Sequence, residues 1–393
     1  MTLTLPRRVL VLGLARSGQA AATALARRGV DVVAADRTLG NDDDESALDG
    51  VELVVKSPGV PAENVLVRTA RSREIPVWSE VELGYRLLPD ARFVGVTGTN
   101  GKTTTTELLG AMFRAAGHDV EVAGNVGRPL TSIKPADWVV CELSSFQLED
   151  VHDLACEIAV LLNLEPDHLD RHTSFDAYRD AKLRIFERTA TSIVPEGLGL
   201  PGTVFSRHDP LPAEPRIPGG HNRENAAAAT AAARAAGIGD HAIAEALRSF
   251  PGVEHRLETV AEVAGVLYVN DSKATNVAAA RRALAAYERP LHVIFGGSLK
   301  GEDFTPLAAA IAENVRAAYL IGEAADELDA ALRPAGVTIE RCGDLATAVT
   351  RAAAEARIGE IVLLSPACAS FDAFRDFEHR GEEFRRLAQN LEG

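Results

Sequence analysis

An α/β fold with three domains, each a mostly parallel sheet with helices, is the class that the sequence predicts. Short runs rich in Val, Leu and Ile alternate along the whole chain with Ala-rich segments of helical length, which is typical of parallel strands joined by crossover helices. The chain's 393 residues are also too many for one ordinary core, since domains usually hold roughly 100 to 200 residues.

Ten apolar runs are predicted to form strands, and the Ala-rich tracts are predicted to form helices packed closely against the sheets. One such tract, NAAAATAAARAAG, starts at Asn225. The stretch from Ile193 to Gly220 is rich in Pro and Gly and predicts a loop with one strand. The predicted strands are VLVLGL, VDVVAAD, ELVVKS, FVGVTG, WVVCEL, IAVLLNL, GVLYVND, LHVIFGG, AAYLIG and EIVLLSP.

Two Pro-containing breaks divide the chain. The tripeptide LPD at residues 88–90 stands just before the strand FVGV, and FPG at residues 250–252 follows the predicted helix AIAEALRSF. Pro interrupts helices and strands alike, so it often marks a connection between elements. We therefore predict domains at residues 1–90, 91–252 and 253–393.

The overall charge and the cysteines limit the possible functions. The formal net charge of -15 disfavours nucleic acid as a partner, because a phosphate backbone normally requires a basic face. The four cysteines lack CxxC spacing, which indicates neither a disulfide framework nor a zinc site and fits a reduced, cytoplasmic setting. The N-terminal run VLVLGLA has only strand length, so we predict no signal peptide and no membrane insertion. We expect a monomer that acts on small molecules.

The stretch GVTGTNGKTTTT predicts a phosphate-binding loop. It follows the strand FVGV and precedes a helix, with Gly98 and Gly101 at the turn and Lys102 and Thr103 after them. In such loops, backbone N–H groups and one lysine bind the phosphates, and the hydroxyl reaches a magnesium ion. The standard pattern G-x-x-x-x-G-K-[ST] has a glycine where this chain has Val96, which indicates a variant class of the loop. The alternative is an ordinary strand-to-helix turn.

Two other predicted strands end in ionic groups. WVVCEL ends near Glu142, and IAVLLNLEPDHLDRH leads to Asp167, His168 and Asp170. Because the carboxyl ends of parallel strands meet at one edge, these groups and the loop would converge there as a magnesium and triphosphate site. Taken singly, a glutamate at a strand end is more often a solvated rim charge.

The N-terminal unit VLGLARSGQAAATALARRGVDVVAAD is similar to a dinucleotide-binding fingerprint, with Gly13, Gly18 and Asp36 in the expected places. Ala15, however, stands where a second glycine normally lets the backbone approach a pyrophosphate. A nicotinamide or flavin dinucleotide site, a site for another nucleotide and a purely structural turn all stay open. KSPGV, residues 56–60, ends the third strand at the same edge and also reads as a simple turn.

Further polar segments allow two interpretations. Lys182 lies on a predicted helix that begins near Ser174, and its spacing alone is typical of a surface lysine. In the last domain, VNDSKATN, GGSLKG and LLSPACASFDAFRDFEHRG end three strands and together predict a second binding face. Each of these three segments alone is also compatible with a helix cap.

Nine segments in order along the chain resemble the motifs of the Mur ligases of peptidoglycan synthesis. The resemblance covers nearly the whole chain, and the last two segments resemble the D-glutamate-adding branch most. It implies a Rossmann-like N-terminal domain, a P-loop ATPase-like central domain and a Rossmann-like C-terminal domain. After Phe186 the chain is shorter than the family usually is and lacks its valine-rich strand. The segments are TGTNGKTTT, GNVG, ELSSFQLE, LNLEPDHLDRH, AKLRIF, GGHNRENAAAA, HRLE, NDSKATN and SPACASFDAFRDFEHRGEEF.

The resemblance implies a ligase reaction and its cofactors. ATP would phosphorylate the carboxylate of UDP-N-acetylmuramoyl-L-alanine, and the amine of D-glutamate would displace the phosphate. Lys102 would hold the β- and γ-phosphates, Thr103 and Glu142 one Mg²⁺, and His168 a second. Lys182 matches the lysine that the family carbamylates, and a carbamate is an anionic oxygen ligand where an ammonium would repel the metal.

The resemblance also implies three groups of binding residues. The nucleotide would contact Gly98, Thr99, Asn100, Gly101, Lys102, Thr103, Thr104, Asn222, Asn225, Arg256 and Asp271. The UDP-linked acceptor would contact Ser17, Asp36, Arg37, Ser57, Gly59 and Asn125. The incoming glutamate would contact Lys273, Thr275, Lys300, Ser370 and Phe377.

Other functions stay open. Within the ligase class, an L-glutamate-adding variant or a folylpolyglutamate synthetase-like enzyme is the nearest alternative, because the same residue types could bind the mirror isomer. From other classes, the N-terminal fingerprint allows an NAD-dependent oxidoreductase, and the loop allows a regulatory ATPase. Ala15 and the polar strand ends of the last domain disfavour both.

Overall fold

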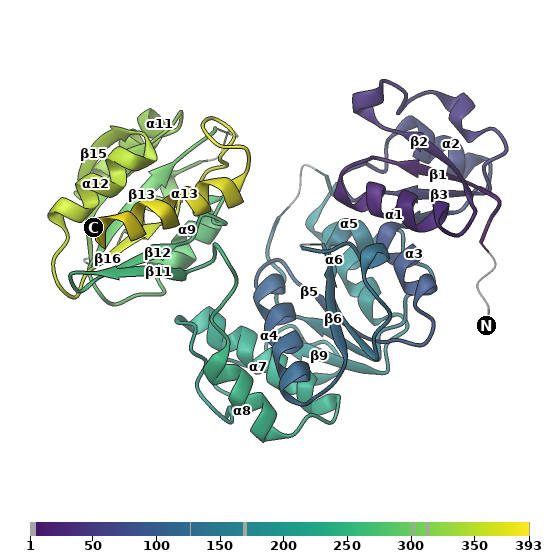
Figure 1. The fold of residues 1–393 in the computed structure, drawn as a ribbon, viewed down its shortest axis with the longest axis horizontal. Coiled ribbons are helices and arrows are strands. Elements are labelled where there is room, and N and C mark those ends of the chain that lie inside the picture. The colour runs from purple at the N-terminus through teal and green to yellow at the C-terminus, as the bar shows by residue number, and fades with distance from the viewer. Residues whose placement is uncertain are drawn as a thin grey trace. The chain divides into compact units, whose positions relative to one another are not determined.

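The structure is a computed structural model that describes residues 5–125, 127–167, 171–299, 301, 303–311 and 314–392 (Figure 1). The chain forms two compact units. The first comprises the residues up to 214 together with 224–249, and the second comprises 215–223 together with 250–393. Each unit is described by itself below.

The first sheet is parallel throughout and has the order β2-β1-β3-β4. Alternate residues of β1 face opposite sides, as the pleat of a strand requires. Leu10 and Leu12 pack with α2, and Val9 and Val11 pack with α1. The sheet is therefore covered on both faces. Its elements are β1 (Arg8–Leu12), α1 (Arg16–Ala26), β2 (Asp31–Ala35), β3 (Leu53–Lys56), α2 (Val65–Ser72), β4 (Val77–Ser79) and α3 (Glu80–Leu87).

The central sheet is also parallel and has the order β10-β9-β8-β5-β7-β6. Strand β5 lies between β8 and β7, so three neighbouring strands end at the same edge. On one face, Phe113 of α4 packs against Trp138 of β7, with ring centroids 4.8 Å apart. The elements are β5 (Arg92–Thr97), α4 (Lys102–Ala115), β6 (Val120–Gly124), β7 (Trp138–Glu142), α5 (Ser145–Leu148), β8 (Ile158–Leu161), α6 (Phe175–Leu183), β9 (Thr191–Pro195), β10 (Thr203–Phe205), α7 (Gly220–Ala235) and α8 (Asp240–Ser249).

The third sheet has the order β11-β12-β16-β13-β14-β15, and only the β11–β12 pair is antiparallel. Helices α9, α10 and α11 supply the core of one face, and α12 and α13 supply the core of the other. The elements are β11 (Glu258–Val263), β12 (Val266–Asn270), α9 (Val277–Leu284), β13 (Leu291–Gly296), α10 (Thr305–Ala308), β14 (Val315–Ile321), α11 (Ala325–Leu332), β15 (Thr338–Gly343), α12 (Leu345–Glu355), β16 (Ile361–Leu364) and α13 (Phe377–Gln389). Short 3-10 helices are η1 (Arg37–Leu39), η2 (Glu45–Leu48), η3 (Leu130–Ser132), η4 (Arg184–Phe186), η5 (Arg333–Ala335) and η6 (Asn390–Glu392).

The described chain consists of mostly parallel sheets with helices, as predicted. Each of the ten predicted runs contains a strand. Strands β4, β6, β11 and β15 were not predicted. The interpretation of residues 193–220 as a loop with one strand is wrong. Strand β10 lies within this stretch, and β9 begins just before it at Thr191. The two strands complete the edge of the central sheet after Phe186. None of the helices in the described part of the chain combines the length and apolar character that a membrane crossing requires.

Helix α3 connects the first sheet to the central sheet. Its Leu83 packs in the core of the first sheet, whereas its Val81 packs in the core of the central sheet. Two fully buried carboxylates add polar contacts. Glu80 accepts hydrogen bonds from the N–H and hydroxyl of Thr131, and Glu82 accepts from the backbone N–H groups of residues 152–154. The predicted boundary at residue 90 stays a prediction, because this helix belongs to both cores.

We expect Glu82→Ala to destabilise the first unit by roughly 2–4 kcal/mol, because it leaves the N–H donors of residues 152–154, of which that of Leu154 is buried, and the guanidinium of Arg86 without their acceptor. Urea unfolding measures the change. The exposed Glu63 provides the matched control, since Glu63→Ala should stay within roughly ±0.5 kcal/mol. Equal stability of the two variants would contradict the role given to Glu82.

Candidate active site

The predicted phosphate loop runs from the end of β5 to Lys102, the first residue of α4. Gly98 has φ +152° and Gly101 has φ +83°, backbone conformations that glycine adopts most easily. A Cβ atom on Gly101 would lie 2.2 Å from Oδ1 of the buried Asn225, and one on Gly98 would lie 2.9 Å from Cβ of Leu162. The loop therefore requires both glycines.

Val96, the departure from the standard pattern, belongs to strand β5 and is fully buried. It pairs with Glu142 on β7 and with Val160 on β8. A side chain at this position fills the core of the sheet, and the irregular backbone begins only at Gly98. The loop therefore needs glycine at positions 98 and 101, and not at position 96, where the standard pattern has one.

Two lysines converge on the phosphate loop. Nζ of Lys102 donates to the carbonyl oxygens of Gly98 and Thr99, at 2.8 and 2.9 Å. Nζ of Lys182, near the end of α6, donates to the same carbonyl of Gly98 at 2.8 Å. Lys182 is only 2% exposed, so its interpretation as a surface lysine is wrong. Helix α6 turns this side chain toward the sheet edge, which residue spacing alone does not reveal.

The buried position changes the acidity of Lys182. Burial, and then the nearby charge of Lys102, lower the pKa of Lys182 to about 7, although Asp167 and Glu142 act in the opposite direction. Both free-energy contributions disfavour the ammonium form. A substantial fraction of this amine is therefore neutral, and nucleophilic, near neutral pH.

Glu142 lies at the end of β7 and is 3% exposed, so it is no solvated rim charge. Its Oε1 accepts a hydrogen bond from Nδ2 of Asn125 at 3.1 Å. Asn125 follows Gly124, where a Cβ atom would lie 2.1 Å from the carbonyl oxygen of Glu142. Gly124 and Asn125 thus pack directly on the strand end. His168 and Asp170 lie outside the described residues, and Asp167 lies at the border of them.

Tyr178 was missed by sequence reasoning. Its hydroxyl lies 3.0 Å from Oγ1 of Thr99, and its ring lies under Nζ of Lys182 at 4.6 Å. Burial raises its pKa to about 12, so it stays a neutral phenol. Asn100 is held as well, because its N–H donates to Oδ1 of Asn163 at 2.8 Å. The only sequence signal for Tyr178 was its position four residues before Lys182, which places both side chains on one face of the helix.

A pocket of about 620 Å³ opens at the carboxyl edge of the first sheet. It unites residues from both sheets of the first unit, because Asn125 of the central sheet contributes to its wall. All six residues predicted for the acceptor line it, namely Ser17, Asp36, Arg37, Ser57, Gly59 and Asn125.

The fingerprint residues around this pocket serve packing. A Cβ atom on Gly18 would lie 1.8 Å from the carbonyl oxygen of Gly13, so the start of α1 rests on the loop. Asp36 accepts hydrogen bonds from the N–H of Leu14 at 2.5 Å and from the N–H and hydroxyl of Thr38, and these contacts lower its pKa. Ala15 begins α1 without a side-chain cap. The carboxylate of Asp36 thereby shapes the loop that a nucleotide would meet.

In the second unit, polar residues gather at the carboxyl ends of β12, β13 and β16. Asp271 is 4% exposed and accepts from Oγ of Ser365 at 2.8 Å, and burial raises its pKa to about 7. Nζ of Lys273 lies 5.8 Å from the ring centroid of Phe377, and Ser370 is buried nearby on the same strand edge. Lys300 lies outside the described residues.

Two of the polar segments predicted to form a binding face, VNDSKATN and LLSPACASFDAFRDFEHRG, also contain helix caps. Asn276 accepts from the N–H of Ala279 at the start of α9, and Asp376 accepts from the N–H of His379 at the start of α13. The predicted ligand residues Lys273, Thr275 and Ser370 are not these caps. The segments therefore combine a cap with a polar strand end.

Arg380 was also missed, and it organises this edge. Its fully buried guanidinium donates to the carbonyl oxygens of Ser272, Cys368 and Ala369, at 2.9, 3.1 and 3.0 Å. It also reaches the carbonyl of Gly296 at 3.4 Å. Burial lowers its pKa to about 10. One side chain of α13 thus joins the loops that follow β12, β13 and β16.

The predicted nucleotide residues are divided between the units. Asn225 belongs to the first unit and lies against Gly101, as described above. Asn222, Arg256 and Asp271 belong to the second unit, where Asn222 donates to the carbonyl of Pro218 at 2.6 Å.

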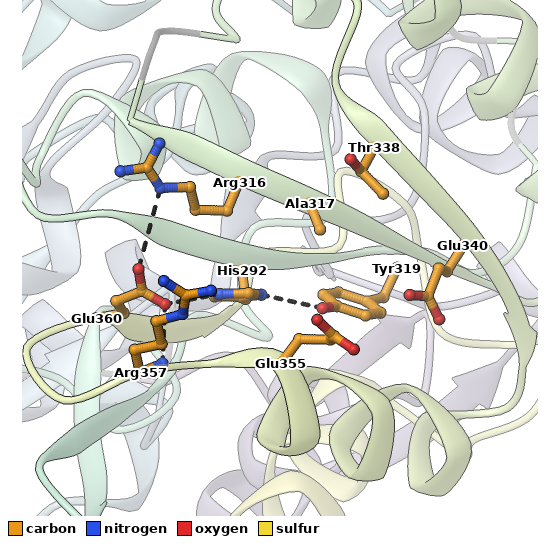
Figure 2. A pocket seen from close by; sticks show the side chains of 9 residues that line it. All are labelled: His292, Arg316, Ala317, Tyr319, Thr338, Glu340, Glu355, Arg357 and Glu360. Atoms are coloured by element: carbon orange, nitrogen blue, oxygen red, sulfur yellow. Dashed lines mark hydrogen bonds and ion pairs between the residues drawn. The ribbon is translucent and has the colours of Figure 1, made fainter.

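The second unit has a hollow of about 470 Å³ at the amino ends of β13, β14 and β15 (Figure 2). It lies at the end of the strands opposite to the polar edge described above. Its centre is His292, whose Nδ1 lies 2.9 Å from the hydroxyl of Tyr319 and whose Nε2 lies 3.0 Å from a carboxylate oxygen of Glu360. Arg316 and Arg357 flank this chain of contacts (Figure 2). None of the predicted site residues lines this hollow.

Comparison with known proteins gives consistent matches. The family model "Mur ligase middle domain" matches residues 96–197, and "Mur ligase, glutamate ligase domain" matches residues 255–368. Proteins called UDP-N-acetylmuramoylalanine--D-glutamate ligase are similar over nearly their full length. The one from Anaeromyxobacter dehalogenans is 41% identical over 450 aligned positions, covering 97% of both chains, and the one from Sphingopyxis alaskensis is 41% identical over 426, covering 98% of both.

Solved structures share the fold at low identity. UDP-N-acetylmuramate-alanine ligase MurC from Thermotoga maritima aligns with a TM-score of 0.66 at 19% identity, over 98% of this chain and 99% of that one. E. coli FolC, in complex with DHPP and ADP, aligns with a TM-score of 0.58 at 19% identity, over 79% of this chain and 92% of that one.

We expect Gly101→Ala to weaken ADP binding about tenfold or more, because its methyl group would collide with the buried Asn225. Gly117→Ala is the matched control. Gly117 has φ +82°, close to that of Gly101, but open space surrounds it. Both variants should lose some stability, and only the first should lose affinity in calorimetry. Equal affinity in both would remove the loop geometry from nucleotide binding.

Proposed function

The chain belongs to the Mur ligase family, and we propose that it uses ATP to join D-glutamate to the carboxylate of UDP-N-acetylmuramoyl-L-alanine, a step of peptidoglycan precursor synthesis. The observation that carries the proposal is the convergence of Lys102, Lys182 and Glu142 at one sheet edge, in a chain whose relatives bear the name of this reaction.

ATP binds at the phosphate loop. The N–H groups at the start of α4 and the ammonium of Lys102 stabilise negative charge on the β- and γ-phosphates. In the free protein, Lys102 donates to the carbonyls of Gly98 and Thr99, so it exchanges these acceptors for phosphate oxygens. Transfer of the γ-phosphoryl group to the acceptor carboxylate gives an acyl phosphate, whose carbonyl carbon the amine of D-glutamate then attacks, with phosphate as the leaving group.

The donor set fits magnesium. The hydroxyl of Thr103 and the carboxylate of Glu142 offer hard oxygen atoms, which Mg²⁺ prefers. When bound, Mg²⁺ neutralises charge on the transferring phosphoryl group. We assign Thr103 and Glu142 to one Mg²⁺ and His168 to a second, with Lys182, as a carbamate, as a further oxygen ligand beside them.

Lys182 is suited to become a carbamate. Its pKa of about 7 supplies a neutral amine, which adds to the carbon of CO2 while one amine proton passes to water. Carbamate formation changes the charge of this side chain from positive to negative. The ammonium of Lys102, which repels the cationic form, attracts the carbamate. It also supplies oxygen atoms beside Glu142, whose charge acts on Lys182 in the free protein.

The pocket of the first unit takes the UDP-linked acceptor. Its six predicted residues, Ser17, Asp36, Arg37, Ser57, Gly59 and Asn125, offer hydroxyl, carboxylate, guanidinium and amide groups for sugar and phosphate oxygens. The N-terminus of α1, which no side chain caps, carries a partial positive charge that favours a diphosphate.

The second unit takes the amino acid. Lys273 and Lys300 bind the two carboxylates of D-glutamate, together with hydroxyls of Thr275 and Ser370 and the ring edge of Phe377. Arg256, Asp271, Asn222 and Asn225 lie along the nucleotide. We infer a monomer acting in the cytoplasm, where ATP is available.

The folylpolyglutamate synthetase-like alternative has weaker support. The FolC structures share the fold at 19% identity, whereas the D-glutamate-adding relatives are 38–41% identical over nearly the full chain. An NAD-dependent oxidoreductase is disfavoured by the same relatives.

The direct test is release of phosphate from ATP in the presence of Mg²⁺ and UDP-N-acetylmuramoyl-L-alanine. We expect release with D-glutamate and at least about tenfold lower kcat/KM with L-glutamate, because the mirror isomer misplaces one carboxylate or the amine. Release that is independent of the UDP-linked acceptor, or equal with both isomers, would contradict the proposal.

A second test compares the two lysines. Lys182→Ala and Lys102→Ala should each reduce turnover about 10²-fold or more. Added acetate or formate should partly restore Lys182→Ala, since a small carboxylate can supply the missing oxygens, but not Lys102→Ala, which lost a cation. Full activity of Lys182→Ala, or an equal response of both variants, would eliminate the carbamate.

A further inference from the structure

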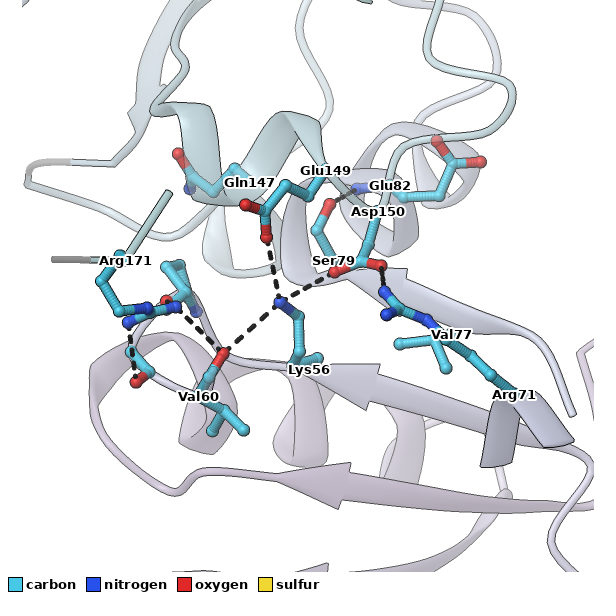
Figure 3. Close-up of polar contacts among 12 residues, drawn as sticks. Lys56, Val60, Arg71, Val77, Ser79, Glu82, Gln147, Glu149, Asp150 and Arg171 are labelled. Carbon is cyan, nitrogen blue, oxygen red and sulfur yellow. Dashed lines mark hydrogen bonds and ion pairs between the residues drawn. The ribbon is translucent and has the colours of Figure 1, made fainter. Parts of the chain in front are cut away.

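The turn that follows β3 forms one wall of the acceptor pocket and is held from outside by two cations. Residues 57–60 form this turn, closed by the N–H of Val60 donating to the carbonyl of Ser57 at 3.1 Å. The guanidinium of Arg171 donates to the carbonyl oxygens of Pro58, Gly59 and Val60, at 3.5, 3.3 and 3.3 Å. Nζ of Lys56 reaches the carbonyl of Val60 at 3.4 Å (Figure 3).

Groups from the central sheet hold both cations in place. Arg171 lies over the ring of Phe146 on α5, 4.5 Å from its centroid. Lys56 is 1% exposed and forms ion pairs with Asp150 at 2.8 Å and Glu149 at 3.7 Å, directly after α5 (Figure 3). Because a buried ammonium needs such partners, the turn of the first sheet is tied to one helix end of the central sheet.

This arrangement determines what the turn offers to the pocket. In a planar trans peptide the carbonyl and the following N–H point in opposite directions. With the Pro58 carbonyl directed at Arg171, the N–H of Gly59 points away from Arg171. Gly59 and Ser57 line the pocket. Val60 also touches the pocket floor, since a Cβ atom on Gly13 would lie 2.8 Å from its Cγ2.

We propose that Arg171 is a positioning residue for the UDP-linked acceptor, with Lys56 as its support. It acts through the turn without touching the substrate, by keeping three carbonyl oxygens on the outer side so that Ser57 and the N–H of Gly59 face the ligand. This inference rests on the assignment of the pocket to the acceptor. It concerns acceptor affinity alone, because among the described residues Arg171 contacts the turn and Phe146 and acts on the charge of Glu149.

The test compares steady-state constants of four proteins, the wild type, Arg171→Ala, Arg171→Lys and the control Arg179→Ala. The side chain of Arg179 on α6 is 41% exposed and pairs with Asp176 and Asp180. We expect Arg171→Ala to raise the KM for UDP-N-acetylmuramoyl-L-alanine about tenfold or more, with kcat and the KM for ATP within about twofold of wild type. Arg171→Lys should be intermediate, because an ammonium lacks the planar fork that reaches three oxygens. The control should match the wild type.

Three results would overturn the proposal. They are an unchanged acceptor KM in Arg171→Ala, a loss confined to kcat, and equal effects on the KM for ATP and for the acceptor. If Arg171→Ala does not fold, Arg171→Lys and Arg171→Gln are judged by the same ratio of the two KM values. A wild-type enzyme that does not respond to the acceptor would refute the proposed function instead, and calorimetry of UDP binding to wild type and Arg171→Lys would then test the turn alone, with equal affinities overturning it.

Discussion

The carbonyl oxygen of Gly98 accepts hydrogen bonds from two lysine side chains, which two helices of the central sheet bring to the same place. Lys102 reaches it from the first residue of α4 and Lys182 from the last turn of α6, each at 2.8 Å. A carbonyl has two lone pairs, so the geometry is satisfied, but two like charges in a buried place repel each other. Burial lowers the pKa of Lys182 most, and this repulsion lowers it further. A substrate phosphate that draws Lys102 away, or an anion formed on Lys182, would relieve it.

The first two sheets act as one support for two sites. Helix α3 places side chains in both cores, and the buried Glu80 and Glu82 bind backbone or hydroxyl groups of the central sheet's loops. The acceptor pocket consequently includes Asn125, whose amide also contacts Glu142 beside the phosphate loop. A carboxylate held in this pocket and a nucleotide held at the loop thus share one framework.

Much of this organisation was predictable from the sequence. Apolar runs identified the inner strands, and the polar groups after them fell at the expected edges, as Glu142 and Asp271 illustrate. The missed strands have reasons. Strands β11 and β15 are partly exposed and interrupt their apolar residues with charged ones, and β4 has only three residues. The buried state of Lys182 and the roles of Arg171 and Arg380 depend on contacts between segments distant in sequence, so no local pattern reveals them. For Tyr178, the spacing from Lys182 is a local signal, but the contact with Thr99 is not. His168 and Lys300 lie beyond the part of the chain that the structure describes.

The division of the chain has a consequence for dissecting the molecule. Residues 215–223 belong to the second unit although residues 224–249 return to the first, so the chain crosses between the units three times. A recombinant fragment that starts at Phe250 would lose this segment. The lost residues include Ile217, whose Cγ2 would lie 3.1 Å from a Cβ atom on Gly252, and the half-buried His221, on which the charges of Arg256 and Arg282 act. Such a fragment would expose the surface that the missing peptide covers. Adding a synthetic peptide of residues 215–223 in trans offers a way to measure what that short crossing contributes to the folding of the C-terminal half.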